Sequence, residues 1–190
     1  KKLKRFLLLI KISKKMIKNK LTENAKTIDR FLVNYLEKQN KSLLIQPMKY
    51  GVISGGKKIR STIILSAGKI FNLDKKKLIN ICAAVECIHS YSLIHDDLPC
   101  MDDDSVRRGK PAAHIKFGEA SAVLAGNSLL TLAFEIIADK NYSINPKLKN
   151  EIIKSLAFCS GHTGIAGGQE LDLKFENKKK SLKQIVEMQK

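Results

Sequence analysis

Apolar residues recur at helical spacing through almost the whole chain, and this spacing limits the fold to one class. Between residues 21 and 36 they return every three or four positions, with polar residues between them, as in a helix with one buried face. The same pattern follows Gly55-Gly56 and Asn145-Pro146, where a cap residue followed by proline is typical of a helix start. No segment shows sustained two-residue alternation. We therefore predict an all-α protein.

Two further segments are apolar on most sides, as expected for helices in the middle of a bundle. They are Leu78–Leu98 and Phe117–Ala138, and small residues in the second would let a neighbouring helix approach closely. The longest strongly apolar runs, such as Phe6–Ile10, are far shorter than the roughly 20 residues that a bilayer needs. We expect a helical bundle with buried central helices and no stable membrane insertion.

The formal net charge of +17 is concentrated at the two ends of the chain. Residues 1–20 contain nine Lys or Arg and no acidic residue. The basic ends contain only two aromatic residues, Phe6 and Phe175, too few to stack on bases, so we expect no nucleic-acid partner. We expect residues 1–20 to be a disordered or artefactual extension and residues 21–190 to fold. A surface-binding arm is the alternative for residues 1–15.

The four cysteines form no CxxC pair and match no zinc-site spacing. The N-terminal apolar stretch is too short for the core of a signal peptide and lacks a small-residue cleavage site. Reduced thiols in a cytoplasmic protein are the expectation that follows.

Five carboxylates fall within the nine residues Asp96–Asp104, at the end of a nearly charge-free helical segment. Carboxylate oxygens are ligands for Mg²⁺, and the following Arg107 and Arg108 are suited to phosphate oxygens. This combination predicts a Mg²⁺-diphosphate site, whereas the alternative is a solvated acidic turn. On an unbroken helix Asp96 and Asp102 would point about 240° apart. Pro99 should interrupt the helix, but the spacing leaves open whether the two carboxylates converge.

These motifs resemble those of the trans-isoprenyl diphosphate synthases, with the greatest similarity to the bacterial farnesyl diphosphate synthases. Asp96–Asp102 followed by Arg107-Arg108-Gly109 is similar to the family's first aspartate-rich motif. Gly55–Arg60 is similar to its GGKxxRP motif, with Ser61 in place of the usual Pro. Further matching segments are residues 84–95, 114–119 and 168–172.

The resemblance covers about residues 22–190 in the family's order, and it implies an isoprenoid-synthase-like bundle of which this chain is the N-terminal part. The chain stops at Lys190, before the expected Lys-Thr motif, and the second aspartate-rich motif is absent. We therefore expect somewhat over half of an enzyme, inactive by itself.

The resemblance implies a prenyltransferase that condenses isopentenyl diphosphate with dimethylallyl or geranyl diphosphate to make farnesyl diphosphate. Asp96 and Asp102 would hold Mg²⁺, as two or three ions in the complete enzyme, while Asp97 would add negative charge. Arg107 would bind the allylic diphosphate. The residues implied for isopentenyl diphosphate are Lys57, Arg60, His89 and Arg108. A core role for His89 and a solvated helix start at Lys57 and Arg60 are the alternatives.

Tyr91 and Ser92 lie five and four residues before the first aspartate, where the resembled family sets the floor of the prenyl pocket. A Tyr beside a small Ser favours closure at fifteen carbons, and interhelical packing is the alternative for Tyr91. A geranylgeranyl diphosphate synthase and a non-catalytic helical partner subunit are the alternative functions. The resemblance also implies a homodimer with isoprenyl diphosphates as its small-molecule partners.

Overall fold

The two apolar segments expected at the centre form helices α4 (Lys75–Asp96) and α6 (Glu119–Ala138), which make the most extensive interhelical contact. Small side chains on α6 let the helices approach closely. A Cβ atom on Gly126 would lie 2.2 Å from Nε2 of His95 on α4. This contact and the buried Leu129 and Ile136 place the core between α4 and α6.

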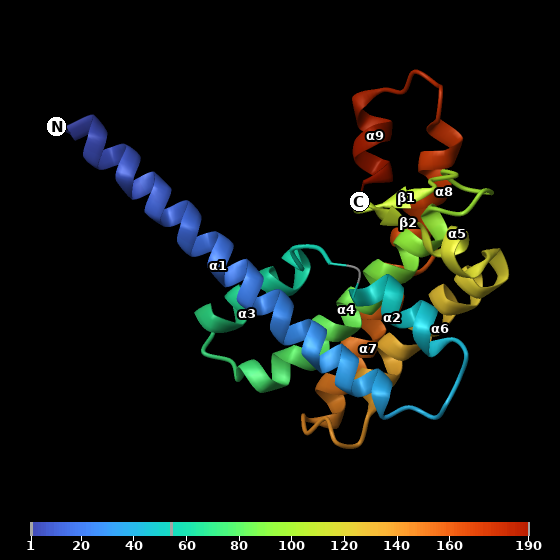
Figure 1. The fold of residues 1–190 in the computed structure, drawn as a ribbon, viewed down its shortest axis with the longest axis horizontal. Helices are drawn as coiled ribbons and strands as arrows, with labels where there is room; N and C mark the ends of the chain where they lie inside the picture. Colours follow the sequence, from blue (N-terminus) through green and yellow to red (C-terminus); the bar gives the residue numbers. More distant parts are fainter. Residues whose placement is uncertain (1, 54, 190) are drawn as a thin grey trace.

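This computed structural model describes the backbone of residues 2–53 and 55–189 and the side chains of residues 14–53 and 55–189 (Figure 1). Within that part of the chain, nine helices and one short hairpin account for the regular structure. The remaining elements are α1 (Lys2–Glu37), α2 (Ile45–Ile53), α3 (Ile59–Ile70), β1 (Val106–Arg107), β2 (Lys110–Pro111), α5 (Ala113–Phe117), α7 (Pro146–Ser160), α8 (Ile165–Phe175) and α9 (Leu182–Met188). The all-α prediction is confirmed.

Helix α1 packs on the bundle through its C-terminal half and projects from it through its N-terminal half (Figure 1). Ile28, Leu32 and Leu36 recur at helical spacing and are fully buried or nearly so. We expected residues 1–20 to be a separate, disordered or artefactual extension. Instead, α1 begins at Lys2 and continues without a break past residue 20. The side chains of residues 1–13 lie outside the described part of the chain, so their role stays a prediction.

The hairpin of β1 and β2 was not predicted, because four residues are too few to show alternation. Its antiparallel register pairs Val106 with Pro111 and Arg107 with Lys110. The two turn residues, Arg108 and Gly109, both have positive φ, at 54° and 74°, as tight two-residue hairpin turns require. The turn therefore sends the adjacent arginines in different directions.

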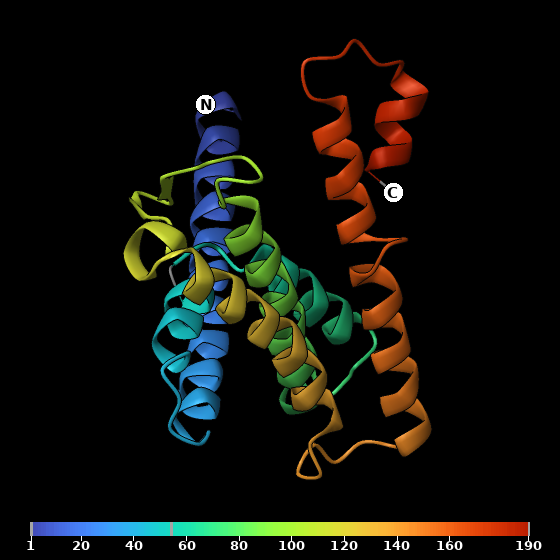
Figure 2. The same ribbon diagram turned by 90° about the vertical axis from the view of Figure 1, so that its right-hand side faces the viewer.

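Helices α7 and α8 follow one another along one side of the bundle (Figure 2). The start of α7 was predicted correctly, because the Asn145 side chain accepts a hydrogen bond from the Lys147 amide at 2.8 Å. In α8 no described residue is buried. This helix nevertheless carries two polar residues to the end of α4, as described below.

By length and composition alone, α4 and α6 are long and apolar enough to cross a membrane. The expectation of no stable membrane insertion rested on uninterrupted apolar runs, which are shorter than these two helices. In the bundle, 61% of the apolar window of α4 and 44% of that of α6 are buried. The core helices of soluble proteins pass the same test, so these helices are weak indications of a membrane span.

The core assignment predicts unequal effects for two leucines on α6. Leu129 is fully buried, so Leu129→Ala should lower the free energy of unfolding by about 2–5 kcal/mol, because it leaves a cavity. Leu124 is 51% exposed, so Leu124→Ala should change it by no more than about 0.5 kcal/mol. Urea denaturation followed by circular dichroism measures both variants. Equal destabilisation by the two changes would contradict this core.

Candidate functional site

The chain reverses direction immediately after α4, and this turn brings Asp102 back to Asp96. Asp96 is the last residue of the helix and Asp97 follows as its cap. The Asp102 amide donates to the Asp96 carbonyl at 2.9 Å, and the Leu98 carbonyl accepts two further backbone bonds from the turn. Pro99, which cannot continue the helical bonding, lies within this turn. The interruption proposed from the sequence is therefore present.

The turn after α4 brings several negatively charged side chains close to one another. Burial raises the pKa of Asp102, and Asp96, Asp104 and Asp172 raise it further, whereas Arg107 opposes the shift. Asp172 comes from α8, so the carboxylates of two distant segments act on one another. Repulsion of this kind is relieved when a cation binds among the carboxylates.

The donor set fits Mg²⁺, although it does not surround an ion by itself. Among the described residues, no group of three His, Cys, Asp or Glu side chains is arranged to hold a metal. Mg²⁺ commonly takes only one or two carboxylates, with water and substrate phosphates as its other ligands. Asp96 and Asp102 offer such hard oxygen ligands at one end of the helix bundle.

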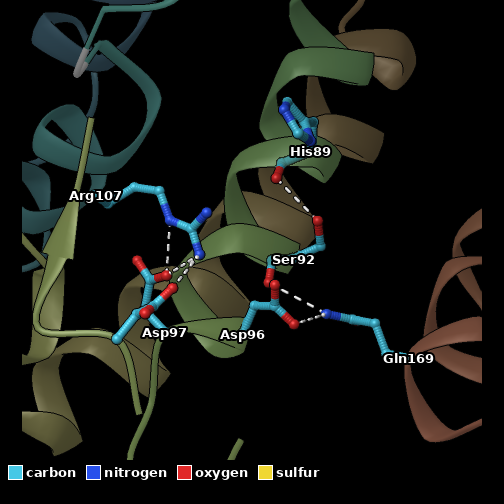
Figure 3. A network of polar contacts seen from close by, with 7 residues as sticks. His89, Ser92, Asp96, Asp97, Arg107 and Gln169 are labelled. Atoms are coloured by element: carbon cyan, nitrogen blue, oxygen red, sulfur yellow. Dashed lines mark hydrogen bonds and ion pairs between the residues drawn. The ribbon is translucent and has the colours of Figure 1, made fainter. Parts of the chain in front are cut away.

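Gln169 on α8 reaches the end of α4 (Figure 3). Its amide nitrogen donates to Asp96 Oδ1 at 3.1 Å and to the Ser92 carbonyl at 3.4 Å. The sequence placed Gln169 in a matching segment but gave it no role. A cavity of about 350 Å³ lies along this side, and Gln169, Asp172 and Phe158 are among its lining residues.

Asp97 points away from Asp96 and binds Arg107 (Figure 3). Its side chain is 4% exposed, and its Oδ1 accepts from Arg107 Nε at 2.7 Å and from Nη2. The hydrogen bond to Asp97 raises the pKa of Arg107. The sequence assigned separate roles to these two residues, whereas the structure pairs them. Arg107 is 31% exposed and lies 3.4 Å from Asp104, so it also borders the acidic turn.

Arg108 extends from the hairpin turn toward the Gly55-Gly56 segment. Its guanidinium donates to the Gly55 carbonyl. A Cβ atom on Gly56 would lie 2.8 Å from Arg108 Nη1, and Gly56 has a φ of 106°. The positive φ favours glycine there, and the absence of a side chain leaves room for the flexible end of Arg108.

His89 lies on α4 among the cations that were predicted to bind isopentenyl diphosphate. Burial lowers its pKa to about 4, and Arg60, Arg108 and Lys58 lower it further, whereas Glu86 opposes them. A neutral imidazole surrounded by cations is suited to an anionic ligand. Lys57 is exposed, and it lines a cavity of about 630 Å³ with Lys14, Lys18 and Lys26 of α1.

Tyr91 and Ser92 are both buried, one helical turn before the aspartates. The Tyr91 hydroxyl donates to the Ser160 carbonyl at the end of α7, at 3.2 Å, and its ring lies edge-on to His95. Ser92 Oγ donates to the His89 carbonyl at 3.0 Å. Tyr91 thus joins α4 to α7, as its interhelical-packing alternative requires, at a depth that also suits a pocket floor.

A polar cluster not predicted from the sequence is formed by the buried Lys58, Ser61 and Glu86 and the partly exposed Asp29. Lys58 and Glu86 are 6% and 3% exposed. The available signal was Glu86 itself, a single acidic residue within an apolar helix, because a buried carboxylate needs a partner.

Comparison with known proteins adds four findings. A family model described as polyprenyl synthetase matches residues 41–190. Farnesyl diphosphate synthase of Escherichia coli is 48% identical over 136 residues, which cover 71% of this chain and 46% of that protein. The Bacillus subtilis farnesyl diphosphate synthase is 41% identical over 173 residues, which cover 88% and 58%. The solved structure of an FPP/GFPP synthase from Zymomonas mobilis matches with a TM-score of 0.85 and 39% identity, over 90% of this chain and 63% of that one. The chain spans about half the length of the curated relatives it matches.

The environment of His89 predicts a dependence of stability on pH. Its folded-state pKa of about 4 lies below its ordinary value of 6.5. Between these values the unfolded chain takes up a proton that the folded chain does not, so stability falls as the pH falls through this window. His89→Gln should therefore reduce the shift of the urea midpoint between pH 6.5 and pH 4. The matched control is His162→Gln, at an exposed position, which should leave the shift unchanged. A shift that is the same in all three proteins would contradict the placement of His89.

Proposed function

The chain belongs to the polyprenyl synthetase family, and we propose that it supplies the diphosphate-binding half of a prenyltransferase. The proposed reaction condenses isopentenyl diphosphate with dimethylallyl or geranyl diphosphate to make farnesyl diphosphate. The observation that carries the proposal is the division of charge around α4. Carboxylates gather at its end, whereas cations gather beside His89 two turns earlier.

The acidic end of α4 is the proposed site for the allylic substrate. Asp96 and Asp102 would hold Mg²⁺, which neutralises the leaving diphosphate when it is bound. Gln169 holds Asp96 in place. Asp97 orients Arg107 beside the acidic turn, where the guanidinium can contact the same diphosphate. Arg107 is thus the proposed allylic-diphosphate ligand, and Asp97 acts through it.

The cationic group is the proposed site for isopentenyl diphosphate. Arg60 and Arg108 both act on His89, and Lys57 adjoins Gly56 at the start of the same segment. Binding there would place the double bond of isopentenyl diphosphate near the allylic carbon, so that a carbon–carbon bond forms as the diphosphate leaves that carbon. A proton is then lost from the isopentenyl part to restore the double bond. Holding two reactants in this way accounts for a large share of rate acceleration in two-substrate reactions.

The product and the assembly are further parts of the proposal. Tyr91 favours farnesyl over geranylgeranyl diphosphate in this proposal, because its large buried side chain extends from α4 to the Ser160 carbonyl at the end of α7. A non-catalytic partner subunit is less well supported, since this chain keeps Asp96 and Asp102.

The exposed apolar residues Ile115 and Leu124 support a homodimer. The cysteines, unpaired among the described residues, support a cytoplasmic location.

Binding of an allylic analogue tests the acidic site. Calorimetry with geranyl thiodiphosphate should show binding that depends on Mg²⁺ and is lost when EDTA is added. Asp102→Asn should weaken binding at least tenfold, because it removes a metal ligand. Asp103→Asn is a matched control, since Asp103 has a φ of 53°, a conformation that Asn tolerates, and has no proposed role. Binding that survives EDTA and Asp102→Asn would contradict the proposed function.

Product length tests the role of Tyr91. In an enzyme of the full family length that contains this chain as its N-terminal part, Tyr91→Ala should shift the products beyond fifteen carbons. Truncation removes the ring that extends from α4 to the end of α7. Tyr91→Phe is the control, because it keeps the ring and removes only the bond to Ser160. Chromatography of the dephosphorylated products measures the distribution, and an unchanged distribution in Tyr91→Ala means that chain length is set elsewhere.

A further inference from the structure

A buried ionic cluster lies directly beneath the segment that carries Lys57 and Arg60. Lys58 Nζ lies 3.5 Å from Asp29 Oδ1 and 3.7 Å from Glu86 Oε2, and the Lys58 and Glu86 side chains are 3% and 4% exposed. The three residues come from α1, from the start of α3 and from the middle of α4. Charges so far from water need good geometry to persist, so the cluster fixes the position of each segment relative to the others.

Glu86 also accepts hydrogen bonds at the N-terminus of α3. The residue at the cap position, Lys58, provides no side-chain cap, and the first amides of a helix have no partner within it. Glu86 Oε1 accepts the Ser61 amide at 3.3 Å and the Ser61 hydroxyl at 2.7 Å. A carboxylate at a helix N-terminus also interacts favourably with the helix dipole. One side chain of α4 therefore anchors the first turn of α3.

The backbone between these anchors is held in an uncommon conformation. Lys58 has a φ of 45°, in the left-handed region that a side chain other than Gly or Asn rarely adopts. Its Nζ reaches back to donate to the Val52 carbonyl at 2.5 Å. The ion pairs and this hydrogen bond hold Lys58 inward, and this arrangement leaves its neighbours Lys57 and Arg60 on the exposed side.

We propose that Glu86 and Ser61 are positioning residues of the isopentenyl diphosphate site. They anchor Lys58 and the first turn of α3, and thereby hold Arg60 beside His89 and fix the course of the segment that carries Lys57. This inference rests on the proposed function for the identity of the ligand, whereas the placement of the segment has a separate readout.

This arrangement depends on the residue at position 61, where this chain departs from the motif. The GGKxxRP motif has Pro at this position, and Pro has neither an amide hydrogen nor a hydroxyl. Both hydrogen bonds to Glu86 Oε1 therefore depend on the departure from the motif. Ser61 is fully buried, so its hydroxyl has no route to water instead.

The test combines one variant on α3 and one on α4 with a control variant on α3. Ser61→Ala removes the hydroxyl without changing any charge, and Glu86→Gln keeps the shape but removes the carboxylate charge. Leu65→Ala, one turn further along α3 and buried at 8% exposed, lowers stability without touching the cluster. The 190-residue protein, with ¹³C-labelled histidine, is titrated by NMR, and His89→Gln identifies the His89 signal. Isopentenyl diphosphate binding is measured by calorimetry.

If the two residues position the segment, both variants release Arg60 and open the site to water. The pKa of His89 should then rise from about 4 toward 6.5 by at least one unit. Binding of isopentenyl diphosphate should weaken at least fivefold in both, and Leu65→Ala should leave both quantities unchanged.

A merely structural role gives a different result. If the segment stays in place in Glu86→Gln, loss of the nearby negative charge lowers the pKa of His89. An unchanged or lowered pKa in both variants would therefore overturn the proposal, as would equal effects of Leu65→Ala. If the unaltered protein binds no isopentenyl diphosphate, the proposed function fails. The His89 pKa still decides whether Glu86 and Ser61 hold the segment.

Discussion

Carboxylates that repel one another gather at the end of a helix whose middle turns are largely buried. Burial together with Asp96, Asp104 and Asp172 raises the pKa of Asp102, and most features of the surrounding structure compensate for that repulsion. Gln169 donates to Asp96, and Arg107 binds Asp97. A bound cation would relieve the remaining repulsion, which is the basis for proposing Mg²⁺ and a diphosphate at this end of α4.

The hairpin directs two arginines that are adjacent in the sequence toward different partners. Arg107 lies in β1 and faces Asp97, whereas Arg108 lies in the turn and faces Gly55. Positive φ at Arg108 and Gly109 permits this divergence. The hairpin thus directs one arginine to each of the two diphosphate sites that we propose.

The cations that we propose as the isopentenyl diphosphate site are held in place around the buried carboxylate of Glu86. Without Glu86, Asp29 would be the one ionic partner left to Lys58 among the described side chains, and the first turn of α3 would lose its cap. Breaking a buried ion pair in proteins commonly costs about 3–5 kcal/mol, because one charge is left uncompensated. The exposed lysine and arginine that would meet substrate are therefore placed by neighbours that never touch it.

The sequence alone determined the helical class, the central helices α4 and α6 and the start of α7, because apolar spacing and caps are local properties. It also pointed to the residues around Asp96 and His89 as candidates, since carboxylates beside an apolar helix and the matched motifs are visible in one dimension, and their roles stay predictions. It missed the hairpin, the continuity of α1 past residue 20 and the roles of Glu86 and Gln169. Only the tertiary structure decided that Asp102 returns to Asp96, that Asp97 pairs with Arg107 and that Glu86 anchors Ser61. These are contacts between separate segments or across a turn, and their free energy depends on distance and burial, which spacing along the chain does not specify.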